Sequence, residues 1–401
     1  MVELRVLHVL DGAARVSGVA THVRGLIAEQ RAFGYDVRVM ALMNSVATQL
    51  PDFAQERFPS TFSHVQGWRA RAALQRQLTR TNPALIHLHS GFTTISPVLV
   101  RAFAAFAPTI GTLHDVRPFC FRADRLKQPQ ATECSEVCGY RCIANGCYAP
   151  RTPLDLIKRI RTLATCSAAL TAWRELAGIV VPSRYMEKLA LKHGFSAALL
   201  TRIPNFTNLG PPRLPGSRPV KPSIVYMGRL TAEKGVSVLI DALKRIERYD
   251  WNAILVGEGP LSTALADKTS QYGLRGRVTI LSDVDPNERS AILARSYMLV
   301  LPSLIPESFG LSGLEASAHG LPVVSFGLGG VTEWLREGRT GLIARPAEAE
   351  ALATQMIRLL EAPEFASRLG IAGQQLIRRQ FTAAGAVKRL SQLYETCMAT
   401  Q

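Results

Sequence analysis

The chain has 401 residues, enough for two domains, and its 47% hydrophobic and 19% charged residues are typical of a globular protein with a large core. No stretch reaches the ~18 uncharged apolar residues of a membrane span, and Glu3 and Arg5 interrupt the apolar N-terminus, which argues against a signal peptide and predicts a cytoplasmic protein. Most of the net charge of +16 lies in residues 1–205, so we expect an anionic partner there.

Strand-like and helix-like segments alternate along the first half of the chain. Residues 4–10 predict a strand, residues 19–33 a helix that ends before Gly34, and residues 36–42 a second strand. Short apolar strands that end in polar residues follow at "ALIHLHS" (84–90), "PTIGTLHD" (108–115) and "AGIVVPS" (177–183). This alternation predicts a parallel sheet that helices cover on both faces.

The first strand leads into "DGAARVSGVATHV" (11–23), where Gly12 and Gly18 flank a loop that opens a helix. Backbone N–H groups at a helix N-terminus bind phosphate, so Gly18 is a candidate phosphate contact. An ordinary tight turn would use the same glycines, and the spacing is not the GxGxxG of dinucleotide-binding folds.

A basic helix is expected at "GWRARAALQRQLTR" (67–80). At 100° per residue its arginines gather on one side and its leucines on the other. This pattern predicts peripheral attachment to an anionic membrane surface, although an ordinary domain helix with a solvated basic side would show the same pattern. No basic motif with interleaved aromatic residues supports nucleic-acid binding. The residues concerned are Arg69, Arg76 and Arg80 on one side and Leu74 and Leu78 on the other.

Five of the seven cysteines fall within residues 120–147, a segment with too few large apolar residues to form its own core. Clustered thiols in a cytoplasmic chain suggest a structural zinc site, in which thiolates hold the metal at ~2.3 Å. Free or regulatory thiols, disulfides and an iron–sulfur cluster are the alternatives. The candidate ligands are Cys120, Cys134, Cys138, Cys142 and Cys147.

The segment 203–223 is rich in proline and breaks the alternation, so we interpret it as a linker. Strands and helices resume after it, which predicts a second parallel α/β unit of similar size. Open parallel sheets bind ligands at the carboxyl ends of their strands. Two such sheets that face each other would form a cleft, and we therefore look for chemistry at the strand ends.

The first strand of the second unit ends in "YMGRLTAEKGV" (226–236). Arg229 follows the strand and Lys234 opens the next helix. A planar guanidinium and a point charge around one loop are well suited to bind a diphosphate. Two solvated loop charges are the alternative interpretation.

Two glutamates stand eight residues apart in "PESFGLSGLEASAHG" (306–320). Glu307 precedes a helix and could simply cap it, at a gain of ~1 kcal/mol. A cap does not explain Glu315, which lies about two turns into a helix of small residues. A polyhydroxylated ligand explains both, because carboxylates accept hydrogen bonds from paired hydroxyls.

Together these motifs, with "VGEGP" (256–260) and "VVPSRYMEKLALKHG" (180–194), resemble the retaining glycosyltransferases of family 4 over residues 4–397. The resemblance implies an α/β protein of the GT-B fold, with two facing Rossmann-like domains and a cleft between them. It places an acceptor-side domain at 1–204, with a C-terminal helix of about 382–401 packed back on it. The nucleotide-sugar domain is expected at 205–381.

The resemblance also implies a role for each matching residue. Glu307 would contact hydroxyls of the donor sugar, Glu315 the nucleotide ribose, and Arg229 and Lys234 the diphosphate. His114 in "TLHD" matches a histidine near the donor sugar and acceptor, although a histidine with satisfied hydrogen bonds at a strand end is the alternative. The catalytic candidates are therefore His114 and Glu307, and the expected donor-binding residues are Gly18, Arg229, Lys234, Gly257, Ser308, Phe309, Gly310, Leu311 and Glu315.

The expected donor is a UDP-sugar, with a GDP-sugar as the alternative, because Ser282 stands where the family has a glycine before the nucleobase. The expected acceptor is a sugar or a lipid-linked glycan of polysaccharide, glycolipid or cell-envelope synthesis. Arg229, Lys234 and helix N-termini would stabilise the leaving diphosphate without a catalytic divalent metal. A nucleotide-sugar epimerase and a non-catalytic binding module of the same fold remain the rival functions.

Overall fold

The computed structural model describes residues 4–11, 18–43, 55–59, 67–89, 95–120, 122, 124–127, 132–145, 147, 152–207 and 221–399. The chain divides into two compact units. The first unit comprises Met1–Pro204 together with Ala383–Gln401, and the second comprises Asn205–Thr382. The expected linker at 203–223 spans the boundary between them, and its residues 208–220 lie outside the described part.

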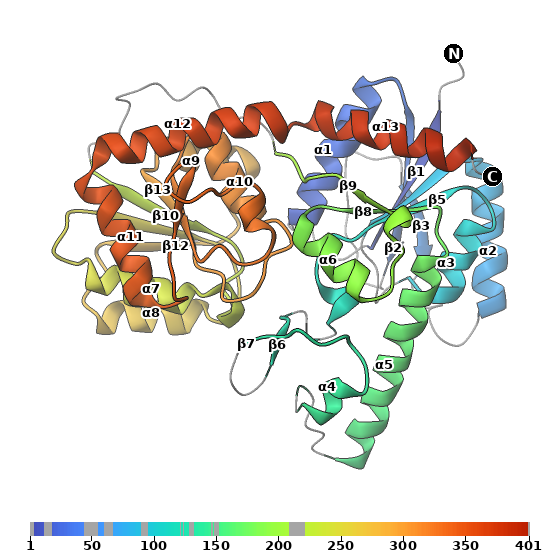
Figure 1. The fold of residues 1–401 in the computed structure, drawn as a ribbon, viewed down its shortest axis with the longest axis horizontal. Coiled ribbons are helices and arrows are strands. Elements are labelled where there is room, and N and C mark those ends of the chain that lie inside the picture. Colours follow the sequence, from blue (N-terminus) through green and yellow to red (C-terminus); the bar gives the residue numbers. More distant parts are fainter. Residues whose placement is uncertain are drawn as a thin grey trace. The chain divides into compact units, whose positions relative to one another are not determined.

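A seven-stranded parallel sheet forms the centre of the first unit, in the order β3-β2-β1-β4-β5-β8-β9 (Figure 1). The chain leaves β1 toward β2 and later returns to β4 on the other side of β1. The carboxyl ends of β1 and β4 therefore form the switch point where such sheets bind ligands. The strands are β1 (Arg5–Asp11), β2 (Asp36–Met43), β3 (Gln55–Pro59), β4 (Leu85–His89), β5 (Thr109–Thr112), β8 (Gly178–Val181) and β9 (Leu200–Arg202).

Helices cover this sheet, and they include the last helix of the chain. Helix α13 packs against α1 (Figure 1), and its Tyr394 is fully buried. Every residue of β4, β5 and β8 is buried as well, which explains why these strands are short and apolar. The helices are α1 (Gly18–Ala32), α2 (Gly67–Thr81), α3 (Pro97–Ala104), α5 (Pro153–Arg174), α6 (Arg184–Lys192) and α13 (Ala383–Ala399).

The cysteine-rich segment forms an excursion between β5 and α5. It contains a short antiparallel pair, β6 (Leu126–Lys127) and β7 (Thr132–Glu133), followed by the one-turn helix α4 (Arg141–Ala144). In Figure 1 these elements can be followed along the chain into the long helix α5. Thr152 caps α5, because its hydroxyl accepts the N–H of Asp155 at 3.1 Å.

The second unit has a six-stranded parallel sheet in the order β12-β11-β10-β13-β14-β15. The expectation of two α/β units with parallel sheets is confirmed. The switch point here lies between β10 and β13. The strands are β10 (Ser223–Met227), β11 (Asn252–Val256), β12 (Val278–Leu281), β13 (Met298–Leu301), β14 (Val323–Ser325) and β15 (Gly341–Ile343).

Six helices flank this second sheet in the described residues (Figure 1). The two that follow β10 and β13 start beside the switch point, so they place loop residues at its edge. The core below them holds the fully buried Trp251 and Trp334. The helices are α7 (Val236–Arg245), α8 (Ser262–Gln271), α9 (Pro286–Arg295), α10 (Leu311–Ala318), α11 (Ala349–Glu361) and α12 (Pro363–Gln380).

Candidate functional site

Two loops meet at the switch point of the second sheet, one after β10 and one after β13. Gly235 starts α7 with φ +68°, and a Cβ at this position would lie 1.9 Å from the carbonyl oxygen of Pro302. Only glycine therefore allows the loops to approach this closely. The N–H of Leu304 donates to the carbonyl of Glu233 at 3.0 Å and joins the two loops.

This close approach brings two of the predicted site residues together. Lys234 Nζ lies 2.6 Å from Glu307 Oε1, and both side chains are largely buried. The hydroxyl of Ser303 donates to the same carboxylate oxygen. Burial raises the pKa of Glu307, but Lys234 and Ser303 outweigh it and leave the pKa below its usual value. Glu307 is therefore an ionised carboxylate that is held in place.

Arg229 lies at the same strand end but is much more exposed. Its side chain is 67% exposed and its guanidinium is 3.2 Å from Glu233. Its positive charge also contributes to the low pKa of Glu307. The carbonyl of Arg229 accepts the hydroxyl of Tyr226 at 2.6 Å, which holds the backbone while the guanidinium stays accessible. An exposed cation next to a buried ion pair is an arrangement suited to an anionic ligand.

Glu315 lies on α10 and pairs with Arg289 of α9, with 2.9 Å between Oε2 and Nη2. Burial raises the pKa of Glu315 above its usual value, and Arg289 and His319 offset this only in part. His319 also bonds the carbonyl of Glu315 and the hydroxyl of Ser290. Arg289 was not among the predicted site residues, because no motif in "DPNERSAILAR" marks it and only the packing of α9 on α10 makes it a partner of Glu315.

Two of the predicted donor-binding glycines have conformations that require glycine. Gly257 has φ +153°, and a Cβ here would lie 1.8 Å from the carbonyl oxygen of Gly228. Gly310 starts α10 with φ +76°. Both glycines shape the loops at the carboxyl edge of the sheet.

The remaining predicted donor-binding residues have different surroundings. The side chain of Phe309 is buried against Phe381, with ring centroids 5.8 Å apart, so only its backbone can face a ligand. Ser308 and Leu311 are partly exposed at the start of α10. Gly18 is exposed as the first residue of α1, and the loop of residues 12–17 before it lies outside the described part.

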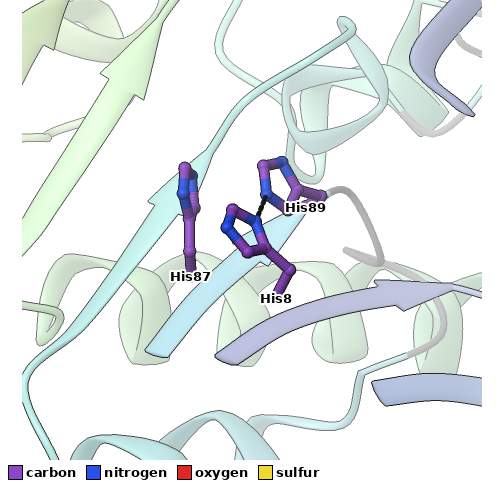
Figure 2. A group of neighbouring side chains, drawn as sticks. All are labelled: His8, His87 and His89. Carbon is purple, nitrogen blue, oxygen red and sulfur yellow. Dashed lines mark hydrogen bonds between the residues drawn. The ribbon is translucent and has the colours of Figure 1, made fainter. Parts of the chain in front are cut away.

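His114 follows β5 in the first unit and is 5% exposed. Its Nε2 lies 3.1 Å from Nδ1 of His89, which in turn contacts His8. Figure 2 shows His8, His87 and His89 with their rings close together, on the adjacent strands β1 and β4. These three histidines were not among the predicted site residues. The available signal was the spacing of two in "HLH", because it places both histidines of β4 on one face of the sheet.

The structure does not gather the five cysteines around one point. In the described parts of the chain, only His8, His87 and His89 bring three or more metal-ligating atoms within 4.8 Å of one another. Cys138 and Cys142 are hydrogen-bonded, and this bond lowers the pKa of Cys142 to about 6. Cys120 instead donates to Asp124, at 3.8 Å. The zinc site remains a prediction.

A buried arginine anchors the cysteine-rich segment. The guanidinium of Arg125 donates to the carbonyl of Phe119 at 3.2 Å, to that of Glu136 at 3.0 Å, and also to that of Cys134. Arg125 is only 3% exposed. One side chain thus ties two stretches of the cysteine-rich segment to Phe119, which belongs to the core of the first unit.

The expected basic helix is present as α2, but its apolar face is not available to a membrane. Leu74 and Leu78 are buried in the core of the first unit, and Arg76 and Arg80 remain exposed. No helix in the described residues is long and apolar enough to span a bilayer.

Comparison with known proteins agrees with this architecture. The family model "Glycosyltransferase Family 4" matches residues 16–210, and "Glycosyl transferases group 1" matches residues 215–376. Glycogen synthase of Mycobacterium tuberculosis is 26% identical over 94% of this chain and 91% of its own length. D-rhamnosyltransferase WbpZ of Pseudomonas aeruginosa is 35% identical over 40% of this chain and 41% of its own.

Solved structures share the fold. The structure of Anabaena Alr3699/HepE in complex with UDP-glucose has a TM-score of 0.72 and 19% identity, covering 99% of this chain and 100% of that one. Two family models that follow each other along most of the chain, both of glycosyltransferases, agree with the two α/β units. The chain therefore belongs to the family 4 glycosyltransferases, has their two-domain GT-B fold and transfers sugars.

Proposed function

We propose that this glycosyltransferase uses a nucleotide-diphosphate sugar, retains the anomeric configuration and needs no catalytic metal. The observation that carries the proposal is the Lys234–Glu307 pair at the switch point, at 2.6 Å, with Glu315 about one turn into the following helix. Lys234 and Arg229 bind the diphosphate, Glu307 binds hydroxyls of the sugar and Glu315 binds the ribose. The two cations stabilise the charge that develops on the leaving diphosphate.

Retention is proposed to proceed by attack on the same face as the departing diphosphate. A double displacement needs a carboxylate nucleophile directed at the anomeric carbon. Glu307 already accepts hydrogen bonds from Lys234 and Ser303, and its lowered pKa makes it a weak nucleophile. These contacts favour a binding role for Glu307 rather than a covalent one.

UDP is the nucleotide we propose, since a protein of the same fold is described in complex with UDP-glucose. GDP is the alternative, because Ser282 leaves the base pocket undefined. The acceptor is proposed to be a sugar or a lipid-linked glycan. His114 in the first unit is proposed to contact the reacting sugar or the acceptor hydroxyl.

Peripheral attachment to an anionic membrane is also part of the proposal, but on another helix than expected. The first two turns of α5 expose Leu154, Ile157 and Ile160, with the basic Lys158 and Arg161 among them. An apolar row among basic residues suits a surface of anionic lipid. Sedimentation with anionic vesicles should be lost in Ile157→Glu and kept in Arg76→Glu, which lies on α2; equal binding of both variants would contradict this assignment.

The enzymatic proposal can be tested with a panel of UDP- and GDP-sugars. A donor that binds the folded state should raise the melting temperature, and transfer from that donor should persist in EDTA. NMR spectroscopy of the product should show the anomeric configuration of the donor. Loss of transfer in EDTA, an inverted product, or epimerisation without an acceptor would each contradict the proposal.

A further inference from the structure

Seven buried polar side chains form one continuous chain of hydrogen bonds in the first unit. Their positions follow from the sheet. His87 and His89 lie two residues apart on β4, while His8 on β1 pairs in register with His87, so all three side chains point to one face. Helices α1 and α13 supply Gln30 and Tyr394 on this face. The members in order are Thr112, His87, Tyr394, Gln30, His8, His89 and His114, all of them buried.

The Gln30 amide lies in the middle of this chain, and one branch leads from it to His114. Gln30 Oε1 is 2.7 Å from Nε2 of His8, and Nδ1 of His8 is 2.7 Å from Nε2 of His89. Nδ1 of His89 is then 3.1 Å from Nε2 of His114. Figure 2 marks the His8–His89 bond.

The other branch leads from Gln30 to Thr112. Gln30 Nε2 donates to the hydroxyl of Tyr394 at 2.9 Å, and this hydroxyl lies 2.9 Å from Nδ1 of His87. Nε2 of His87 is 2.7 Å from the hydroxyl of Thr112. The amide thus has a partner on each of its two polar atoms.

These hydrogen bonds argue against a metal at His8, His87 and His89. All six ring nitrogens of the three side chains already have a hydrogen-bond partner. The 2.7 Å between His8 and His89 is also shorter than the roughly 3.3 Å between two nitrogens on one tetrahedral zinc, given Zn–N bonds of ~2.0–2.1 Å. Hydrogen bonding explains the cluster without an ion.

The order of donors and acceptors in the first branch is set by the amide. Oε1 of Gln30 can only accept, so His8 carries its proton on Nε2 and accepts at Nδ1. His89 must then donate from Nε2 and accept at Nδ1. His114 in turn must donate from Nε2, and in the neutral ring its Nδ1 has no proton. The opposite orientation of the amide would reverse every one of these bonds.

This order of donors and acceptors requires that the imidazole rings of His8, His89 and His114 are neutral, and their burial favours the neutral form. Burial lowers the pKa of His8 to about 4, and it lowers the pKa values of His89 and His114 well below the usual range. At neutral pH each ring thus carries a single ring proton.

We propose that Gln30, held by Tyr394, sets the tautomer of His114 through His8 and His89. These four are positioning residues, and they leave Nδ1 of His114 as the hydrogen-bond acceptor toward a ligand. This inference rests on the proposed role of His114 in glycosyl transfer. Tyr394 belongs to α13, so the C-terminal helix supplies a residue that controls a group at the end of β5.

The first test is the tautomer itself, which needs no substrate. Long-range ¹⁵N–¹H NMR spectra of histidine-labelled protein distinguish protonated from unprotonated ring nitrogens, and His114→Gln assigns the signal. We expect His114 to be protonated at Nε2 in the unmodified protein. Gln30→Met and the milder Tyr394→Phe should convert it to a mixture of tautomers.

The matched control is Tyr35→Phe. The hydroxyl of Tyr35 donates to Ser391 of α13 at 2.6 Å, so its loss weakens the docking of the same helix outside the histidine chain. The tautomer of His114 should not change in this variant.

The second test is kinetic and needs an active donor. The kcat should fall at least about tenfold in Gln30→Met and Tyr394→Phe, with the donor KM nearly unchanged, whereas Tyr35→Phe should keep its kcat.

Several results would overturn the proposal. They are a proton on Nδ1 of His114 in the unmodified protein, an unchanged tautomer in Gln30→Met, and one bound metal ion per chain that is lost in His8→Asn. A fall in melting temperature without a change in kcat would show a purely structural role. Absence of transfer from every donor would refute the proposed function alone, because the NMR result stands without activity.

Discussion

Lys234 and Glu307 form an ion pair at 2.6 Å across two loops that meet at the switch point of the second sheet. Gly235 next to this lysine permits the approach, because any side chain there would collide with the carbonyl of Pro302. Because Gly235 allows the two loops to touch, the cation of Lys234 and the carboxylate of Glu307 lie next to each other in the candidate site.

Glu307→Gln should reduce glycosyl transfer by at least ~100-fold, a typical loss when a charged contact to the transition state is removed. The amide keeps the size of the side chain but removes the charge that Lys234 and Ser303 hold in place. Initial rates with purified protein would measure the effect. Glu348→Gln on the surface is the matched control, and near-normal rates in Glu307→Gln would remove this residue from the site.

Arg289→Gln should weaken binding of the nucleotide by about tenfold, as expected when a buried carboxylate loses its charged partner. Without Arg289 the pKa of Glu315 rises further and the carboxylate is no longer held in one position. Calorimetric titration with UDP or GDP measures the affinity. Arg295→Gln, on the exposed side of the same helix, should bind normally, and equal affinity in the two variants would contradict a role for Arg289.

Stability should fall as the pH drops from about 6.5 to 4. In the unfolded chain an ordinary histidine takes up a proton near pH 6.5, whereas burial lowers the pKa of His8 to about 4 in the fold. The unfolded state binds more protons in this window, so His8 alone accounts for on the order of 3 kcal/mol lost across it. Burial lowers the pKa values of His87 and His89 as well, so both add to the same loss of stability. Urea unfolding at several pH values measures the free energy of unfolding. This free energy should change less between pH 6.5 and 4 in His8→Asn than in the unmodified protein.

Arg125→Met should loosen the cysteine-rich segment without unfolding either unit. The substitution removes the donors to the carbonyls of Phe119, Cys134 and Glu136 while keeping an apolar side chain. Limited proteolysis should cut between residues 120 and 150 much faster, with the melting temperature nearly unchanged. Arg141→Met, at an exposed ion pair with Glu136, should be cut at the original rate.

Protein purified without a histidine tag should contain about one zinc per chain if the cysteines bind metal as expected. Metal analysis together with thiol titration measures this. The low pKa of Cys142, about 6, makes it a thiolate at neutral pH and thus a suitable ligand. The absence of metal together with five reactive thiols in the folded protein would reject the zinc site and leave Arg125 as the anchor of this segment.

Much of the fold could be predicted from local patterns. Alternating strands and helices indicated two parallel α/β units, because hydrophobic periodicity depends only on which face of an element is buried. The motifs around Lys234, Glu307 and Glu315 were visible for a similar reason. Few other residue types can replace a glycine where a loop turns sharply, or a charged residue where a loop is to bind a charged ligand, so these positions can be recognised in the sequence.

What the sequence alone determined is therefore the class of fold and the residues at the strand ends of the second unit. Tertiary structure alone decided the partners: Arg289 for Glu315, Arg125 for the cysteine-rich segment, and Tyr394 for the buried histidines. Tyr394 and His87 are separated by 307 residues. Such contacts arise from the packing of elements that are distant in the chain, and no local period or spacing encodes which side chains that packing brings together.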